Sequence, residues 1–178
     1  TSNAGDVLPT VISRCLRLFF PPLSREEFTK ALGGGGRVPM ESLETLFRLS
    51  RGSPGETLRL AGLLDRRQGL ASLLDAPAAQ AMDLASRELL PPKKKDVSLE
   101  QRRQSALERL DLLFSLLRDR LPGLPPEGRL HADLPAPPSD PRTALKMRAL
   151  SEAREALLGN ADLTLTLECC ASALSLPA

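Results

Sequence analysis

The sequence has no Trp and no Tyr, only five Phe, and only five residues that are Val or Ile. Strands favour β-branched and aromatic side chains, so a sheet of several strands is close to excluded. Leu occurs 38 times among the 178 residues, and Leu is a strong helix former. Because 42% of the residues are hydrophobic and 26% are charged, the chain has the composition of a folded protein of one or two domains. We therefore predict an all-α fold.

Cysteine and histidine are also scarce, with three Cys and one His. Three Cys cannot complete a four-ligand zinc site, and a single His leaves little for catalysis by His or by a Cys–His pair. We predict no metal and no catalytic activity in this chain, and a reduced, cytoplasmic setting fits its cysteine usage. Cys169 and Cys170 lie in an apolar segment and are expected to be buried. His131 lies in a Pro-rich loop and is expected at the surface.

Net charge and hydropathy argue against two further classes of function, namely nucleic-acid binding and membrane association. The formal net charge is +2, which is too small to indicate nucleic-acid binding, because such binding normally needs a basic excess on one face. No apolar run approaches the roughly 18 to 20 residues of a membrane-spanning helix. The first twenty residues lack the layout of a secretory signal. We therefore expect no membrane partner.

Sixteen Pro divide the chain, because Pro lacks a backbone N–H and ends helices. The breaks between helices cluster in four places, at 21–22, 33–39, 91–92 and 122–141. The last of these holds seven Pro and is too long for a simple connection. The expected helices cover 24–32, 40–51, 54–64, 98–121, 142–158 and 161–176, with two more inside 66–90 that are separated near Pro77.

Two of the expected helix starts carry capping signals. Ser24 followed by Glu27 has the form of a capping box, in which the two side chains satisfy free backbone N–H groups of the first turn. Ser53 before Pro54 places a favoured N-cap residue ahead of a residue favoured at the first helical position. The turn at 52–55 has no Lys and follows no buried strand, so it is predicted to be a tight helix–helix corner and not a phosphate-binding loop.

The N-terminal segment follows a different pattern. Apolar and polar residues partly alternate over 15–20, which predicts the one plausible strand of the chain. A lone strand is not stable, so its partner strands are expected before Thr1. A short turn or helix at 9–13 precedes it and delivers Arg14, whose guanidinium could bind a phosphate at a domain surface. From composition alone, an ordinary surface Arg is the more frequent explanation.

Three segments resemble those of a known protein family. Leu8–Cys15 reads LPTVISRC and closely resembles the Ser-Arg-Cys motif of bacterial replicative clamp loaders, the AAA+ assemblies that open a ring-shaped sliding clamp. Leu49–Gly55 followed by Thr57–Leu60 is similar to the lid-domain turn of the delta-prime subunits of DNA polymerase III. Asn160–Glu168 is similar to the last helix of the collar domain of the same subunits. The resemblance extends over essentially the whole chain.

The resemblance implies both an organisation and a role. It implies the end of an AAA+ nucleotide-binding domain, a three-helix lid and a helical collar, at 1–20, 21–64 and 65–178 respectively. It also implies that Arg14, flanked by Ser13 and Cys15, is an arginine finger that reaches in trans into the ATP site of a neighbouring subunit. The implied partners are the clamp-loader ATPase (gamma/tau) and delta subunits, and the sliding clamp and primed DNA are reached through the complex. ATP would be held by the neighbour, and this chain would bind no cofactor.

Departures from the family pattern help to separate its subunits. The chain contains no Walker A loop, and Gly55 stands where the ATPase subunits carry an Arg in the lid turn. A Walker A loop would lie before Thr1, so its absence does not separate the subunits. Gly55 favours a subunit that does not hydrolyse ATP, as the delta-prime subunit does not. Asn3 falls in the segment that approaches nucleotide in ATPase subunits, but Ser2–Ala4 also matches a cloning remnant. Two alternatives stay open, namely a fragment of the ATPase subunit and a generic helical interaction module.

Overall fold

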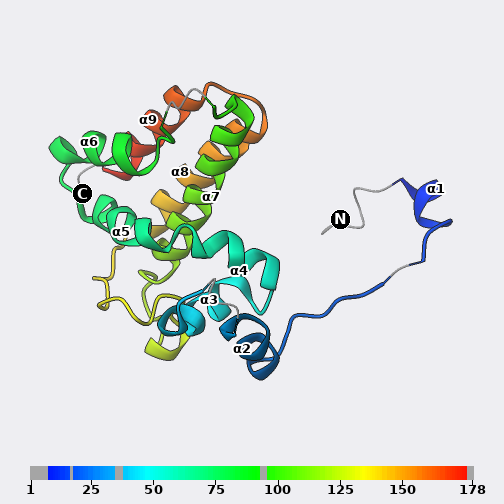
Figure 1. Cartoon of the computed structure of the whole chain (residues 1–178). Coiled ribbons are helices and arrows are strands. Elements are labelled where there is room, and N and C mark those ends of the chain that lie inside the picture. Colours follow the sequence, from blue (N-terminus) through cyan, green and yellow to red (C-terminus); the bar gives the residue numbers. More distant parts are fainter. Residues whose placement is uncertain (1–7, 17, 35–37, 93–95, 176–178) are drawn as a thin grey trace.

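The computed structural model describes residues 8–16, 18–34, 38–92 and 96–175, except for the side chain of Ala78. Within these ranges every regular element is a helix, which confirms the predicted all-α class (Figure 1). Short 3₁₀ helices lie at Met40–Ser42, Leu64–Arg66 and Pro126–Gly128. The α-helices are α1 (Pro9–Ile12), α2 (Arg25–Gly33), α3 (Leu43–Ser50), α4 (Pro54–Ala61), α5 (Arg67–Asp75), α6 (Ala78–Glu88), α7 (Leu99–Arg118), α8 (Thr143–Leu158) and α9 (Leu163–Leu174).

The strand predicted over 15–20 is wrong for the residues of this segment that the structure describes. Leu16, Leu18, Phe19 and Phe20 are not in a strand, and their side chains are exposed. A strand is stable only when its backbone N–H and C=O groups pair with a neighbour, and no second strand exists within the described ranges. The segment therefore runs as an irregular extended chain between α1 and α2 (Figure 1).

Helices α2, α3 and α4 form a unit that we call the small bundle. It begins with the predicted capping box, in which the Ser24 hydroxyl accepts from the Glu27 N–H and the Glu27 carboxylate accepts from the Ser24 N–H at 2.9 Å. Helix α4 begins at Pro54 as expected, but the Ser53 side chain makes no capping hydrogen bond. The apolar core of the small bundle consists of Phe28, Val38, Leu43, Leu46 and Leu60.

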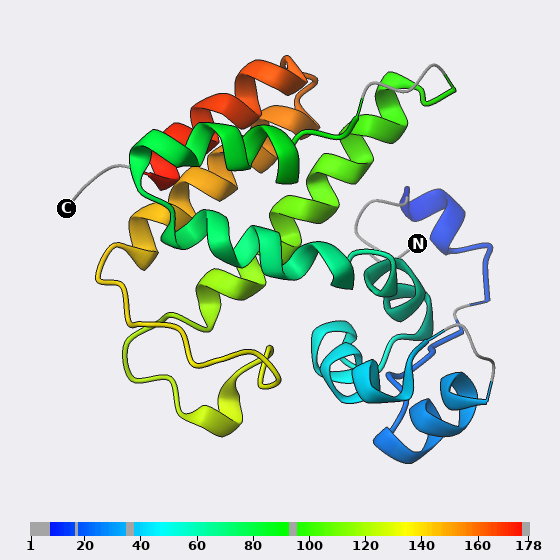
Figure 2. The same ribbon diagram turned by 60° about the vertical axis from the view of Figure 1, so that its left-hand side comes forward.

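Helices α5 to α9 form a second unit that we call the large bundle (Figure 2). Helix α7 runs through it as the longest helix of the described chain and also starts with a capping box, between Ser98 and Gln101. Helices α8 and α9 pack against each other, α8 packs on α7, and α6 packs on α9. The core is made mainly of Leu and Ala, which pack closely between helices. The break predicted near Pro77 is confirmed, because α5 ends at Asp75 and α6 starts at Ala78.

Two expectations about burial are wrong. His131 is only 1% exposed, because the loop after α7 folds back onto that helix and takes the imidazole into the interior. Cys169 is exposed and only Cys170 is buried, since the two neighbours face different sides of α9. Burial raises the pKa of the Cys170 thiol to about 12, so this thiol is protonated at neutral pH. Arg109 of α7 is also buried, and it donates to the Glu88 carbonyl of α6 at 3.1 Å.

No helix within the described ranges combines the length and the apolar character needed to cross a bilayer.

Candidate functional site

The Ser-Arg-Cys motif lies directly after α1. Pro9 occupies the first turn of this four-residue helix, where its missing N–H costs nothing. The Ser13 hydroxyl donates to the Thr10 carbonyl at 3.1 Å, and the Arg14 N–H donates to the Val11 carbonyl at 3.1 Å. These short-range bonds continue the helical turn through the motif and define where the Arg14 side chain leaves the backbone.

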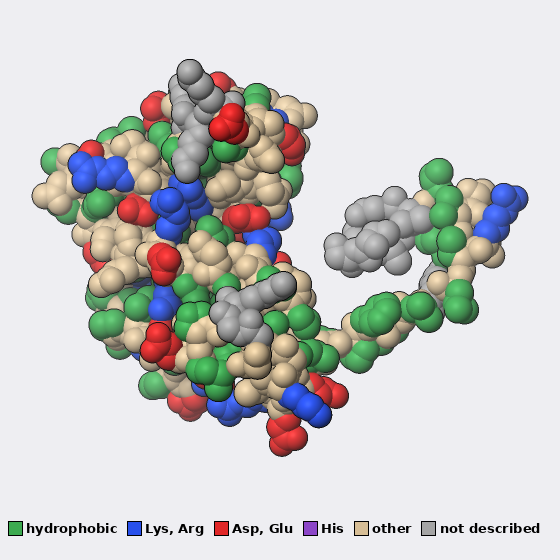
Figure 3. Space-filling model, in the orientation of Figure 1, with side chains coloured by type: hydrophobic (Ala, Val, Ile, Leu, Met, Phe, Trp, Pro, Cys, Tyr) green, Lys and Arg blue, Asp and Glu red, His purple; other side chains and the backbone are tan. Residues whose placement is uncertain are grey.

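Arg14 is available for an external ligand. Ser13, Arg14 and Cys15 are all exposed, and within the described ranges no carboxylate forms an ion pair with Arg14. Figure 1 shows α1 standing away from the two bundles, and Figure 3 shows apolar side chains along the segment between α1 and α2. An unpaired guanidinium can bind a carboxylate or a phosphate through two parallel hydrogen bonds. Asn3, the other nucleotide-related residue of the sequence, lies outside the described ranges.

The Gly-Ser-Pro-Gly turn is the helix–helix corner that the sequence predicts. Arg51 and Gly52 both adopt the left-handed conformation, with φ of 51° and 75°, and end α3. A Cβ on Gly52 would lie 2.5 Å from the Leu23 carbonyl oxygen, so close packing against Leu23 requires Gly here. The Leu23 N–H donates to the Gly52 carbonyl at 3.0 Å, which joins the end of the N-terminal segment to this corner. By contrast, a Cβ on Gly55 would meet no atom within 4 Å, so packing does not demand Gly at that position.

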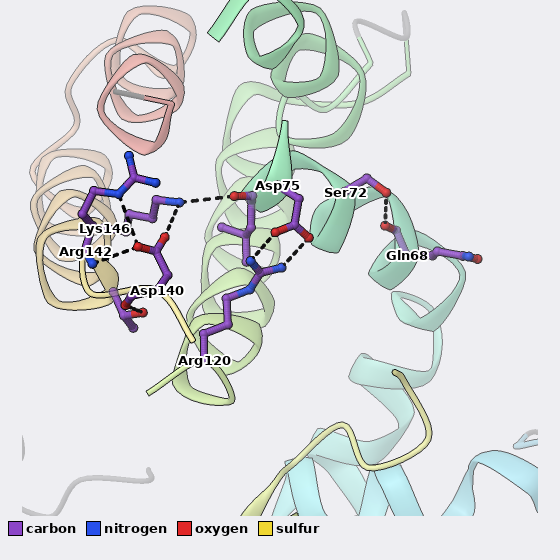
Figure 4. A network of polar contacts seen from close by, with 9 residues as sticks. Gln68, Ser72, Asp75, Arg120, Asp140, Arg142 and Lys146 are labelled. Atoms are coloured by element: carbon purple, nitrogen blue, oxygen red, sulfur yellow. Dashed lines mark hydrogen bonds and ion pairs between the residues drawn. The ribbon is translucent and has the colours of Figure 1, made fainter. Parts of the chain in front are cut away.

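A polar network that sequence reasoning missed joins three parts of the large bundle (Figure 4). Arg120, just after α7, binds the Asp75 carboxylate at the end of α5 through two nitrogens, one of them at 2.7 Å. Lys146 on α8 is buried and contacts Asp140 at 2.8 Å and the Leu74 carbonyl at 3.2 Å. Burial acts to raise the pKa of the Asp140 carboxyl, but bonds from Lys146 and the Arg142 N–H outweigh it and lower that pKa to about 2. Each carboxylate here is matched to a cation, so the network is suited to holding helix ends and not to proton transfer.

The loop between α7 and α8 contains a second polar arrangement. We call residues 126–134 the strap. Thr45 of α3 donates to the Asp133 carboxylate at 2.9 Å, and Arg67 of α5 binds the same carboxylate. Arg48 of α3 donates to the Arg129 carbonyl at 3.1 Å. The strap therefore contacts both bundles. Its residues are far apart in sequence from Thr45 and Arg48, and no local pattern marks the pairing.

No group of three or more potential metal-binding side chains occurs within the ranges that the structure describes. The exposed apolar side chains of the large bundle include Leu145 and Leu158 on α8 and Leu165 on α9, and also Met82 on α6 and Leu99 and Phe114 on α7. Such residues offer contact area to another protein.

Comparisons with protein-family models, with curated proteins and with solved structures find no match to this chain. The functional assignment therefore rests on the motifs and on the geometry of the chain itself.

Proposed function

We propose that this chain is the C-terminal part of a delta-prime-type subunit of a bacterial clamp loader. In this role Arg14 acts in trans on ATP held by a neighbouring ATPase subunit. One observation carries the proposal: within the sequence Ser13-Arg14-Cys15, the Arg side chain is exposed after a short helix and has no carboxylate partner in the described ranges. An arginine finger needs this state before assembly, because a guanidinium already paired with a carboxylate would have to give up that partner.

The chemistry of the proposed role is electrostatic. Negative charge spreads over the γ-phosphate oxygens as phosphoryl transfer proceeds, and a planar cation placed beside them stabilises that charge. A guanidinium can donate to two phosphate oxygens at once, whereas an ammonium acts as a point charge. Arg14 would supply the cation, and the neighbouring subunit would supply ATP, the metal ion and the attacking water. The chain itself would have no catalytic activity.

The arrangement of helices supports the proposed organisation. The small bundle has an apolar core of its own within 21–64, as a lid would, and the larger helical unit follows within 65–178, as a collar would. Exposed Leu145, Leu158 and Leu165 provide surface for neighbouring subunits in a ring. In this proposal the partners are the gamma/tau and delta subunits, the sliding clamp and primed DNA are reached through the assembled complex, and the setting is the bacterial cytoplasm.

The decisive experiment replaces Arg14→Ala in the full-length protein, assembled with its own ATPase and delta subunits. The ATPase copies should carry a defective Walker A Lys except for the copy next to Arg14, so that only one site is measured. Arginine fingers contribute about 10³ to 10⁵ in turnover, so hydrolysis stimulated by clamp and primed DNA should fall at least ~100-fold. Arg14→Lys should restore little, because Lys cannot donate in a bidentate manner.

Arg25→Ala is the matched control for this measurement. Arg25 is an exposed Arg on α2 whose partner, Glu44, lies within the small bundle at 2.7 Å. Its removal should leave hydrolysis unchanged. Equal rates for Arg14→Ala and the unmodified protein would rule out the arginine finger.

Assembly itself tests the alternatives. The unmodified chain should co-elute with the ATPase subunits in gel filtration. A chain that elutes as a monomer in the presence of the ATPase subunits would favour the generic interaction module. Intrinsic ATP hydrolysis by the isolated full-length protein would favour the ATPase subunit.

A further inference from the structure

The two bundles keep separate apolar cores. They are joined by residues 62–66, between the end of α4 and the start of α5. Within this joint, Leu63 is buried in the core of the large bundle, whereas the next residue, Leu64, packs against the core of the small bundle. No buried hydrophobic residue of the described chain belongs to both cores. A turn of the backbone between Leu63 and Leu64 would therefore leave each core intact.

An ion pair and hydrogen bonds link the two bundles. Beside the joint, Arg59 of α4 contacts Glu108 of α7 at 3.3 Å. On α3, Thr45 donates to Asp133 at 2.9 Å and Arg48 donates to the Arg129 carbonyl at 3.1 Å. Relative movement is the usual expectation for two units of one chain that keep separate cores, unless their interface is large and hydrophobic.

The strap is held far more firmly by the large bundle. The Asp119 carboxylate, almost fully buried at the end of α7, accepts from the Leu130 N–H at 2.9 Å and the His131 N–H at 2.8 Å. Arg118 donates to the Gly128 carbonyl at 3.2 Å. The His131 ring lies 2.8 Å from the Ser115 hydroxyl on α7. Movement between the bundles would therefore break the bonds to Thr45 and Arg48 and leave the strap on α7.

We propose that the strap is a latch, and that the small bundle turns about residues 62–66 between a latched and an unlatched state. In the latched state Thr45 and Arg48 bind the strap, and in the unlatched state both bonds are open to water. Such turns are absorbed by a few residues at the ends of elements, as at this joint. The latch goes beyond the proposed clamp-loader function and does not depend on it.

The structure also indicates what the latch positions. The Leu23 N–H bonds to Gly52 in the small bundle, so the N-terminal segment with Arg14 is attached to the moving unit. Unlatching would change where Arg14 lies relative to the large bundle. The partly exposed bonds of the latch favour the latched state by a modest factor, because water replaces them readily.

The test measures the distance between spin labels on the two bundles of the intact chain. Labels are placed at Lys30 on α2 and at Arg87 on α6, both exposed, after the native cysteines have been replaced as Cys15→Ser, Cys169→Ser and Cys170→Ala. The unmodified latch should give one main distance. In the double variant Thr45→Val with Arg48→Met, a second distance should grow. The ratio of unlatched to latched molecules should rise by roughly tenfold or more, since each lost hydrogen bond contributes about three- to tenfold.

Asp133→Asn guards against a folding defect in the small bundle, because it leaves α3 unchanged while it weakens both the bond from Thr45 and the ion pair with Arg67 of α5. It should increase the same second distance by a smaller factor. Arg148→Met is the matched control, since it removes an ion pair with Glu152 that lies wholly within α8 at 2.7 Å. The proposal is overturned if neither latch variant differs from this control, or if the control itself increases the second distance.

Discussion

The two bundles differ in the number of buried hydrophobic residues that stabilise each core. In the described chain the core of the small bundle has five buried hydrophobic residues and is organised around Phe28, whose ring meets Phe47 edge to face at 5.1 Å. The core of the large bundle has twenty-one, almost all Leu and Ala. A small core buries a lower fraction of its apolar surface, so each member carries a larger share of the stability. The difference teaches that a single substitution should matter far more in α2 to α4 than in α5 to α9.

Phe28→Ala should have the largest effect. Removing a buried Phe typically costs about 3 to 5 kcal/mol, which is comparable with the stability of a unit this small. We expect hydrogen exchange to show α2 to α4 losing protection while α5 to α9 keep theirs. Leu113→Ala in the large core is the comparison variant, and it should weaken that unit without unfolding it. Simultaneous loss of protection throughout the chain in Phe28→Ala would show that the cores are not independent.

The second-largest effect should be a destabilisation of the large bundle by acid. Burial lowers the pKa of His131 from 6.5 to about 4, and the charges of Asp119, Arg67, Asp133 and Arg129 around the ring modify this effect. Between these values the unfolded chain binds a proton that the folded chain does not. The free energy of unfolding should therefore fall as pH drops from about 6.5 to about 4, by about 3 kcal/mol at most.

Urea unfolding at several pH values measures this slope. In His131→Gln the slope between pH 6.5 and 5 should flatten, because no other side chain with an ordinary pKa titrates in that window. An unchanged slope would assign the acid sensitivity to carboxylates.

The two capping boxes allow a matched comparison with a smaller effect. Ser24→Ala removes the cap of α2 and Ser98→Ala removes the cap of α7, and each should cost about 1 kcal/mol. Because the small bundle has less stability in reserve, amide exchange in α2 should rise more for Ser24→Ala than exchange in α7 rises for Ser98→Ala. Equal increases would mean that the two units share their stability.

Arg14→Ala should have the smallest effect on folding. The side chain is exposed and makes no ion pair in the described ranges, so the melting temperatures of both bundles should stay unchanged. Calorimetry checks this result. A lowered melting temperature would show that Arg14 has a structural partner, which would weaken its assignment as a finger.

Local chemistry made most of the fold predictable. The lack of β-branched and aromatic residues indicated helices, Pro77 separated α5 from α6, and Ser24 and Ser98 mark helix starts. The predicted strand at 15–20 failed because a strand depends on partners, which a pattern along one segment cannot supply.

The candidate site was predictable only in part. Arg14 was identified from its neighbours in sequence, and its exposure agrees with the proposed role. The burial of His131 and the pairing of Thr45 with Asp133 depend on how the loop after α7 returns to the helices. No local spacing encodes such contacts, because they join residues that only tertiary folding brings together.

The close approach of Gly52 to Leu23 has a mechanical consequence. The backbone of Leu23 lies so close to Gly52 that a side chain at position 52 would not fit. A hydrogen bond from the Leu23 N–H to the Gly52 carbonyl holds the two backbones at this distance. The two Pro that precede Leu23 restrict the backbone in the same region. A tilt of α3 and α4 would therefore carry the backbone at Leu23 with it, and the direction in which the N-terminal segment leaves the small bundle would change accordingly.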